Sequence, residues 1–247
     1  MTHNQVRKDN MFMLLGGIFL TNALIAEMIG PKIFSLEKML GIPPVGIQLG
    51  TYTLDFNLTA GVIIWPFVFI VSDIINEYFG IKGVRKISYA TAGFIAFAFI
   101  IVYIATLLPP ATFWMEINKT DVDGNAFNIN YAFSTIFRQG LGIILGSLTA
   151  FLIGQIVDAT IFGYIRIFTK DKMIWLRATG STVISQLIDS YIVLTIAFYF
   201  FGNWPLEMVL AVGTINFIYK IGAAIILIPL LYIGHFFIDK YLAGKDS

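Results

Sequence analysis

The chain has 247 residues, of which 57% are hydrophobic and 13% are charged, and its formal net charge at pH 7 is +1. Soluble domains contain about 25% charged residues, so this composition indicates an integral membrane protein, and the small net charge gives no electrostatic basis for binding nucleic acid. Because there is no cysteine and there are only two histidines, His3 and His235, the sequence excludes disulfides and thiolate ligands, and we expect no cofactor and no metal.

Six apolar segments follow one another along the chain, each near the ~20 residues that cross a bilayer. They cover about 11–30, 58–80, 88–109, 139–167, 178–201 and 206–236. The first segment follows Arg7 and Lys8 but lacks a small-residue cleavage site, so we expect a retained helix and not a signal peptide. The sequence therefore predicts an all-α membrane protein with six transmembrane helices, in a single domain over 1–247.

Lysine and arginine are unevenly distributed between the connections. One side holds Arg7, Lys8, Lys82, Arg85, Lys86, Arg166, Lys170, Lys172, Arg177, Lys240 and Lys245, and the other holds Lys32, Lys38 and Lys119, with Arg138 at a boundary. Positive residues favour the cytoplasmic side, so both termini are predicted to be cytoplasmic. The opposite connections, about 31–57 and 109–138, contain turn motifs. There is no GxxxxGK[ST] motif, so energy must come from a gradient or from a separate subunit.

Polar residues at the end of the second segment share one helical face. They are spaced i, i+3, i+4 and i+7, and are Asp73, Asn76, Glu77 and Gly80. An isolated carboxylate at membrane depth costs about 2.5–3.5 kcal/mol, so such residues indicate a polar cavity, a partner or a function. The alternative is a solvated helix end whose carboxylates pair with Lys82 or Lys86.

A Gln-x-x-Asp pattern occurs in both the fourth and the fifth segment, as Gln155 with Asp158 and as Gln186 with Asp189. In each, the amide and the carboxylate lie one turn apart on the same face of the helix. The pattern indicates a shared polar site between the two helices; the alternative is structural hydrogen bonding between them. Two aspartates on adjacent helices would also suit an intramembrane aspartyl protease, but the glycine-flanked motif of that class is absent.

The sixth segment carries Asn216 and Lys220, one turn apart. Lys220 is near the middle of the segment, too deep to reach an interface, and so needs a carboxylate partner, for which Asp73, Glu77, Asp158 and Asp189 are available. We expect Glu27 to be interfacial. With more carboxylates than cations, the cavity could take up a proton or attract a cationic or donor-rich substrate. The aromatic residues nearest to these polar positions are Trp65, Phe67, Tyr219 and Phe217.

These residues resemble a known family. Ala60 and Gly61, then Trp65-Pro66-Phe67 with Phe69, then the run from Ser72 to Gly80, are similar to the signature of the queuosine precursor transporter family, also called the vitamin uptake transporter family. The stretch from Gln186 to Ser190 and the Tyr219-Lys220 region match its remaining polar positions. The resemblance covers about residues 10–238.

The resemblance implies a multi-pass protein of the bacterial inner membrane that imports a 7-deazapurine precursor of queuosine. The candidates are 7-cyano-7-deazaguanine, 7-aminomethyl-7-deazaguanine and queuine, taken up for salvage into tRNA modification. It also implies a fold similar to the substrate-binding subunits of energy-coupling-factor transporters, although this family is thought to act without their ATPase. A binding subunit of an ATP-driven importer is therefore the alternative. The sequence leaves open whether the chain forms a homodimer.

The chemistry of a deazaguanine suits such a site. A carboxylate can accept its N1–H and exocyclic amine, a Gln or Asn amide can donate to its carbonyl, and an aromatic wall can stack on its face. Asp189 or Asp158 is favoured to bind the base edge, with Asp73 and Glu77 nearer the cytoplasmic exit. The predicted substrate-binding set is Trp65, Phe67, Asp73, Asn76, Glu77, Gln155, Asp158, Gln186, Asp189, Asn216, Tyr219 and Lys220.

Overall fold

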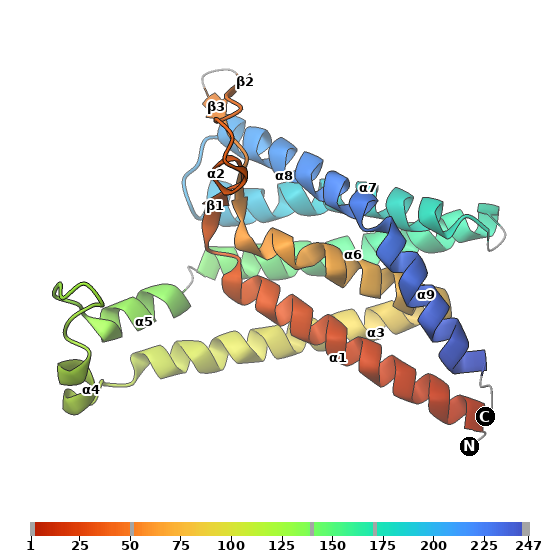
Figure 1. The fold of residues 1–247 in the computed structure, drawn as a ribbon, viewed down its shortest axis with the longest axis horizontal. Helices are drawn as coiled ribbons and strands as arrows, with labels where there is room; N and C mark the ends of the chain where they lie inside the picture. The colour runs from red at the N-terminus through yellow and green to blue at the C-terminus, as the bar shows by residue number, and fades with distance from the viewer. Residues whose placement is uncertain (1–2, 50–51, 139–140, 170–171, 244–247) are drawn as a thin grey trace.

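Long helices that run roughly side by side form most of the molecule (Figure 1). The computed structural model describes residues 3–49, 52–138, 141–169 and 172–243. Within these residues, five helices are long and apolar enough to cross a membrane. They are α1 (His3–Ile29), α3 (Trp65–Leu107), α6 (Leu141–Thr169), α7 (Ile174–Leu194) with its π-helical continuation η2 (Thr195–Phe200), and α8 (Leu206–Ile226). The prediction of an all-α membrane protein is confirmed at this level.

Helix α3 covers both the second and the third apolar segment. Its 43 residues would extend about 64 Å if straight, roughly twice the thickness of a bilayer core. It is interrupted at Gly80, whose φ of 68° and ψ of 179° are not helical. Before Gly80 the chain runs antiparallel to α1, because Gly61, just before the helix, lies against Ala26 near the end of α1 and Phe79 lies against Phe12 near its start, with ring centroids 5.0 Å apart.

After Gly80 the helix runs parallel to α1, because Gly83 lies against Phe12 near the start of α1 and Val102 packs near Met28 at its end. Figure 1 shows the two parts, orange and then yellow, running in opposite directions. The basic stretch at 81–87, expected to be a connection, is therefore helical and follows the bend directly. A short 3-10 helix, η1 (Ala60–Ile63), precedes the first part.

The sixth predicted segment, 206–236, is two helices and not one. Helix α8 ends at Ile226. The next residue, Leu227, has a ψ of 0°, and α9 (Ile228–Ala243) continues in a different direction (Figure 1). The cause is Pro229, which has no N–H for the carbonyl four residues earlier and whose ring would clash with it. Helix α9 is too short to be among the five apolar helices above.

The connection after α1 contains strands, where the sequence indicated only turns. Strand β1 (Ile33–Ser35) pairs with β4 (Asn57–Thr59), and β2 (Ile47–Leu49) pairs with β3 (Tyr52–Leu54), both antiparallel. A short helix, α2 (Leu36–Leu40), lies between them, and its Glu37 accepts hydrogen bonds from the backbone N–H of Phe56 and the hydroxyl of Ser35. We call residues 33–59 the strand cap. The later connection holds α4 (Thr112–Ile117) and α5 (Ile129–Phe137).

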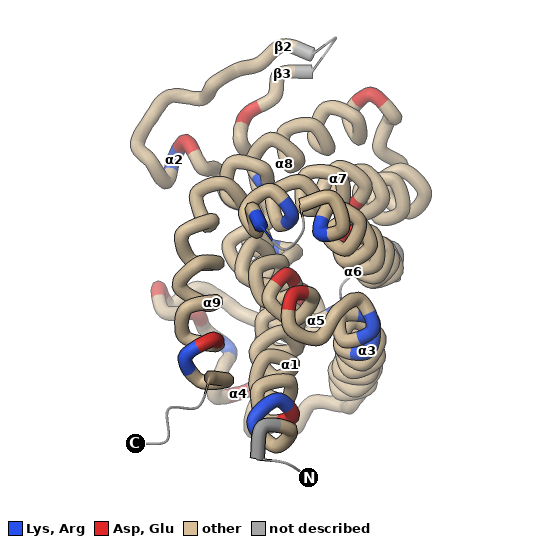
Figure 2. The backbone as a smooth tube through the Cα atoms, turned by 90° about the vertical axis from the view of Figure 1, so that its right-hand side faces the viewer, with Lys and Arg blue, Asp and Glu red and all other residues tan. Residues whose placement is uncertain are grey.

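Both termini lie at one end of the molecule, and the strand cap, α4 and α5 lie at the other (Figure 1). Figure 2 looks onto the end with the termini, where Lys and Arg gather at the start of α1, the end of α9 and along α3. This arrangement agrees with the predicted division of positive charge. Lys170, Lys245 and the start of the fourth segment at 139–140 lie outside the described residues.

Candidate functional site

Two cavities lie between the helices, one toward each end of the molecule. The first, here the strand-side cavity, has a volume of about 190 Å³. It is lined by residues of α1 and the turn after it, the strand cap, η1, α3, α6, α7, η2 and α8, namely Ala26, Glu27, Gly30, Pro31, Ile33, Thr59, Gly61, Val62, Trp65, Ser147, Ala150, Asp189, Ser190, Val193, Leu194, Phe198, Asn216 and Lys220. It combines two carboxylates, an amide and a cation with apolar walls and an indole ring.

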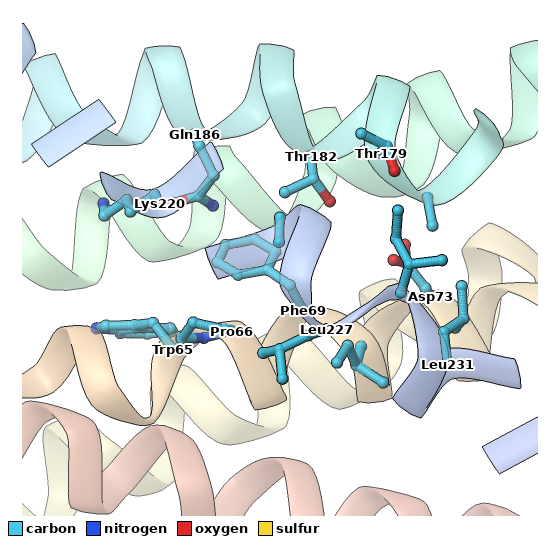
Figure 3. A pocket seen from close by; sticks show the side chains of 14 residues that line it. Trp65, Pro66, Phe69, Asp73, Thr179, Thr182, Gln186, Lys220, Leu227 and Leu231 are labelled. Carbon is cyan, nitrogen blue, oxygen red and sulfur yellow. The ribbon is translucent and has the colours of Figure 1, made fainter. Parts of the chain in front are cut away.

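The second, here the terminus-side cavity, is smaller, with a volume of about 30 Å³ (Figure 3). Its polar lining residues are Asp73, Thr179, Thr182, Gln186 and Lys220, and its apolar wall is formed by α3, α7 and the α8–α9 junction. Trp65 and Lys220 line both cavities. These two side chains therefore stand at the boundary between the two spaces.

Lys220 forms an ion pair with Asp189. Its Nζ donates a hydrogen bond to Asp189 Oδ2, and the two side chains are 11% and 18% exposed. Gly154 of α6 faces Asp189, and a Cβ at Gly154 would lie 3.6 Å from Asp189 Cβ, at an ordinary van der Waals distance, so α6 packs directly against α7 beside the ion pair. Lys220 therefore has the carboxylate partner that the sequence predicted, and the partner is Asp189, one of the four candidates.

The amides differ in what they contact. Gln186 is 1% exposed and lines the terminus-side cavity, where neither of its amide atoms has a hydrogen-bond partner among the described residues. Asn216 lines the strand-side cavity and donates from Nδ2 to the Val212 carbonyl at 3.0 Å. An amide without a protein partner in a cavity is available to a ligand or to water.

The other predicted amides and Asp158 join helices together. Ser72 Oγ donates to Gln155 Oε1 at 2.7 Å, and Asn76 Nδ2 donates to the Ala159 carbonyl at 2.9 Å. Asp158 accepts a hydrogen bond from Ser185 Oγ at 3.0 Å. Gln155 and Asp158 are each 1% exposed and line neither of the two cavities. The alternative of structural hydrogen bonding between helices thus describes the contacts of this first Gln-x-x-Asp pair.

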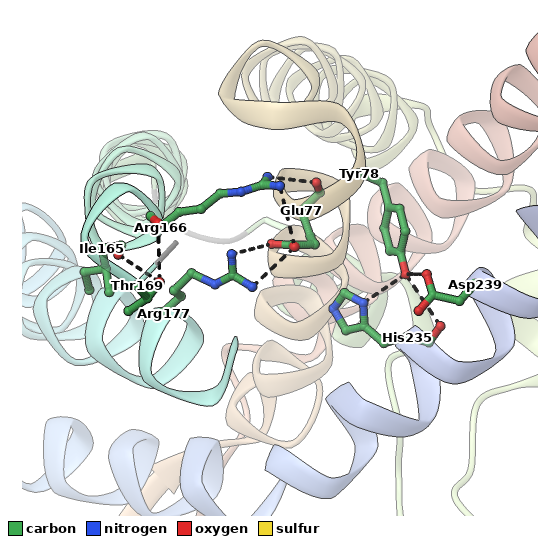
Figure 4. A network of polar contacts seen from close by, with 8 residues as sticks. All are labelled: Glu77, Tyr78, Ile165, Arg166, Thr169, Arg177, His235 and Asp239. Atoms are coloured by element: carbon green, nitrogen blue, oxygen red, sulfur yellow. Dashed lines mark hydrogen bonds and ion pairs between the residues drawn. The ribbon is translucent and has the colours of Figure 1, made fainter. Parts of the chain in front are cut away.

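Glu77 is held by two arginines and not by the neighbouring lysines (Figure 4). Arg177 NH1 lies 3.2 Å from Glu77 Oε2, and Arg166 NH1 donates to the Glu77 carbonyl at 3.0 Å. Arg177 is almost completely buried and also lies over the Phe162 ring at 5.4 Å. Because the partners are on α6 and α7, Glu77 connects three helices, and this network is found in place of the alternative pairing with Lys82 or Lys86.

A second network next to Glu77 was not anticipated from the sequence. Tyr78 donates from its hydroxyl to Asp239 Oδ1 at 2.6 Å and lies 2.9 Å from His235 Nδ1, so it ties α3 to α9 (Figure 4). The spacing of His235 and Asp239, one turn apart, places them on one face of α9, but nothing in the sequence pairs that face with Tyr78.

Two aromatic residues that were predicted to line the site lie outside both cavities, and one carboxylate, Glu27, lies nearer to the site than the sequence indicated. Phe67 is 40% exposed and lines the apolar groove with α1 and α9, and Tyr219 lines neither cavity. Glu27, expected to be interfacial, is 6% exposed, lines the strand-side cavity and is hydrogen-bonded to Ser147. The sequence signal for this burial was the position of Glu27 inside an apolar segment, close to the end of that segment.

The long apolar helices define a multi-pass membrane protein, with ionisable and amide side chains in the cavities between the helices. The family model described as "Putative vitamin uptake transporter" matches residues 59–234, and the chain belongs to that family. It is a transporter and not an enzyme, as the sequence resemblance implied.

Relatives of known name are found in three bacteria. A "Probable queuosine precursor transporter" of Bacillus subtilis is 30% identical over 180 residues, which is 72% of each chain. A protein of the same name from Haemophilus influenzae is 25% identical over 70% of this chain and 66% of its own length. The "Queuosine precursor transporter" of Escherichia coli is 27% identical over 64% of this chain and 61% of its own length. No solved structure matches the chain.

Proposed function

We propose that the chain carries a 7-deazapurine precursor of queuosine into the cell across the bacterial inner membrane. The substrate is 7-cyano-7-deazaguanine, 7-aminomethyl-7-deazaguanine or queuine. The names of the three relatives support the substrate class, and the family supports transport. The chain crosses the membrane six times, since α3 supplies two crossings and both termini are cytoplasmic.

The observation that carries the proposal is the lining of the strand-side cavity. Glu27, Asp189, Asn216 and Lys220 bring carboxylate, amide and ammonium groups to one enclosed space beside the Trp65 ring. A deazaguanine presents adjacent N–H donors on one edge, a carbonyl next to them and a flat apolar face. A carboxylate can accept from the donors, an amide or ammonium can donate to the carbonyl, and an indole can stack on the face.

Within this cavity, Glu27 is the residue that we propose to bind the donor edge of the base. Asp189 is already paired with Lys220, and Asp158 does not line the cavity. Glu27 is buried on α1, opposite the α7–α8 wall that holds Asp189 and Asn216. Gln186 and Asp73 then line the route onward, in the terminus-side cavity.

The two cavities suit alternating access around a site near the midplane. The strand-side cavity faces the outside, the terminus-side cavity faces the cytoplasm, and Trp65 with Lys220 separates them in the conformation described here. Because the chain contains no P-loop motif, we propose that it transports without its own ATP hydrolysis.

Binding by purified protein and uptake by proteoliposomes test the proposal together. The protein should be stabilised thermally by a deazapurine more than by guanine, and proteoliposomes without ATP should exchange labelled 7-cyano-7-deazaguanine for unlabelled substrate. Glu27→Gln should weaken binding by about 10- to 100-fold, because hydrogen bonds to a charged group contribute about 1.5–3 kcal/mol. Glu116→Gln, an exposed residue on α4, is the matched control and should bind normally.

Three results would contradict these assignments. Full affinity in Glu27→Gln removes Glu27 from the binding site. Absence of exchange without added ATPase subunits would favour the binding subunit of an ATP-driven importer. Absence of binding by all three deazapurines overturns the substrate class.

A further inference from the structure

We infer that the buried carboxyl pair of Asp73 and Asp158 binds the proton whose gradient drives uptake. The inference rests on the proposed function and adds an energy source to it. It assigns a second site, for a proton, beside the substrate cavity and separate from it.

The register of α3 against α6 brings these two carboxyl groups together. The hydrogen bond from Ser72 to Gln155 and the one from Asn76 to the Ala159 carbonyl fix the two helices on either side of the pair. Asp73 follows Ser72, and Asp158 precedes Ala159, so their side chains meet between these two contacts. The two carboxyl groups lie within hydrogen-bonding range of each other, and both residues are buried, at 3% and 1% exposure.

A hydrogen bond between two carboxyl groups requires a proton on one of them. Two ionised carboxylates that face each other away from water would repel each other strongly, and a single shared proton removes this repulsion. Ser185 donates to Asp158 Oδ1, but Asp73 Oδ1 and Asp158 Oδ2 have no donor among the residues that the structure describes. The pair therefore has the geometry of a site for one proton.

The charged groups around the pair are themselves paired with other partners. On α3, Glu77 lies one turn after Asp73 and binds Arg177 of α7 and Arg166 of α6. On α8, Lys220 binds Asp189, and on α9, His235 and Asp239 bind Tyr78. Helix α1 has no ionisable side chain between residues 11 and 26. The other groups of α7 that face Asp158 are the hydroxyls of Ser181, Thr182 and Ser185.

Only one member of the pair reaches a cavity. Asp73 lines the terminus-side cavity with Thr182 and Gln186 (Figure 3). Asp158 does not line this cavity and accepts a hydrogen bond from Ser185 of α7. Proton exchange thus occurs at Asp73. Lys220 lines this same cavity and also the strand-side cavity. Substrate binding in the strand-side cavity and protonation of Asp73 in the terminus-side cavity therefore both affect the surroundings of Lys220.

Coupling follows from the contact between α3 and α6. With one proton, the pair holds the two helices together; without it, like charges separate them at that point. One proton enters from outside with one substrate molecule, remains on the pair through the conformational change and leaves from Asp73 to the cytoplasm. No covalent bond forms or breaks besides the O–H bond.

Proteoliposomes with an imposed pH gradient test the inference. The reconstituted full chain should accumulate labelled 7-cyano-7-deazaguanine when the interior is alkaline, with at most about tenfold accumulation per pH unit for one proton per uncharged substrate. An internal pH dye should report proton entry on addition of substrate. Asp73→Asn and Asp158→Asn should both abolish these two signals, and Asp158→Asn, whose side chain lines neither cavity, should retain substrate binding and exchange. The exposed control Asp123→Asn should behave as the unsubstituted protein.

Infrared difference spectra of the detergent-solubilised protein supply a measurement that does not need transport. A protonated carboxyl band should be present in the unsubstituted protein and in Asp123→Asn, and absent from both pair variants. Its absence from the unsubstituted protein overturns the inference even if the pair variants fail to fold.

The transport results separate the two proposals. Exchange of substrate without accumulation under the imposed pH gradient, or accumulation that follows a sodium gradient instead, leaves the proposed function intact and overturns the proton site. Accumulation by Asp158→Asn at the unsubstituted level also overturns it. Absence of exchange with every deazapurine overturns the proposed function, and the inference falls with it.

Discussion

At the scale of single residues, the lysine of α8 shows how a costly charge is stabilised. Lys220 is in the middle of an apolar segment, and it pairs with Asp189 one helix away. Lys220 lines both cavities and Asp189 lines the strand-side cavity, so the pair borders open space and is not fully enclosed by protein. A charge of this kind needs its partner, but the ion pair adds little net stability. The attraction between the two charges mainly offsets the free-energy cost of removing them from water.

Lys220→Met should therefore destabilise the protein by less than the about 3–5 kcal/mol lost when a fully buried pair is broken, because both side chains border a cavity. Asp189→Asn should have a similar effect, since it leaves the lysine without its partner. The double variant should be more stable than the sum of the two losses predicts. Thermal unfolding in detergent measures all three. Additive losses would show that the two charges are stabilised independently.

The acidic residues show what sequence could and could not predict at this scale. Spacing placed Asp73, Asn76 and Glu77 on one face and gave Lys220 four candidate partners. It could not select among them, because the choice depends on the rotation of each helix against its neighbours. Glu27 was expected at an interface because it is near a segment end, and only the packing of α1 against the strand cap places it in a cavity.

At the scale of elements, the two Gln-x-x-Asp pairs have the same spacing and different surroundings. On α7, Gln186 faces one cavity and Asp189 the other. On α6, Gln155 and Asp158 face the contacts with α3 and α7. Helical periodicity predicts that each pair shares a face, but it does not say what that face contacts. The breaks at Gly80 and before Pro229 have local causes, and only the second is a standard signal in a sequence.

Gly80→Ala tests the bend in α3. A φ of 68° with a ψ of 179° is accessible in practice only to glycine, so alanine should cost about 1–3 kcal/mol or straighten the bend. A lower unfolding temperature in detergent is the expected result. Gly93→Ala, in the helical second part and with open space at its Cβ, is the control and should not destabilise the protein. An unchanged unfolding temperature in Gly80→Ala would mean that the bend does not need this backbone conformation.

The strand cap should depend on pH through Glu37. Hydrogen bonds from the Phe56 N–H and the Ser35 hydroxyl hold the pKa of this carboxyl below its usual value. A lowered pKa in the folded state stabilises the cap above the pKa of the unfolded chain, and this stabilisation is lost as the pH falls through the folded-state pKa. Hydrogen exchange across 33–48 and 53–59 should therefore accelerate in acid.

Glu37→Gln is the matched test of that pH dependence. In this variant, the backbone amides of the strand cap should exchange hydrogen faster at neutral pH, because the charge-assisted hydrogen bonds are weakened. Their exchange should then change little in acid. A cap that loses protection in acid equally with glutamate and with glutamine would place the titrating group elsewhere.

At the scale of the whole molecule, the most predictable features are those that the bilayer imposes. Apolar length predicts membrane helices and positive charge predicts their orientation, because both depend on local composition and not on packing. The cavities are harder to predict, because each is formed by residues far apart in the sequence. Trp65, Asp189 and Lys220, for example, come from three helices.

Cysteine labelling can test six crossings and cytoplasmic termini directly, because the chain has no cysteine and each introduced thiol is unique. Met39→Cys and Val122→Cys, both exposed at the end with the strand cap, should react with a membrane-impermeant maleimide in spheroplasts, whose inner membrane is intact and whose outer face is open to the reagent. Lys82→Cys and Lys240→Cys, exposed at the other end, should react only after the inner membrane is permeabilised. If α3 crossed the membrane once, residues 82 and 122 would not be separated in this way. Labelling of residues 82 and 240 in intact spheroplasts would reverse the orientation, and with it the assignment of the strand-side cavity to the outside.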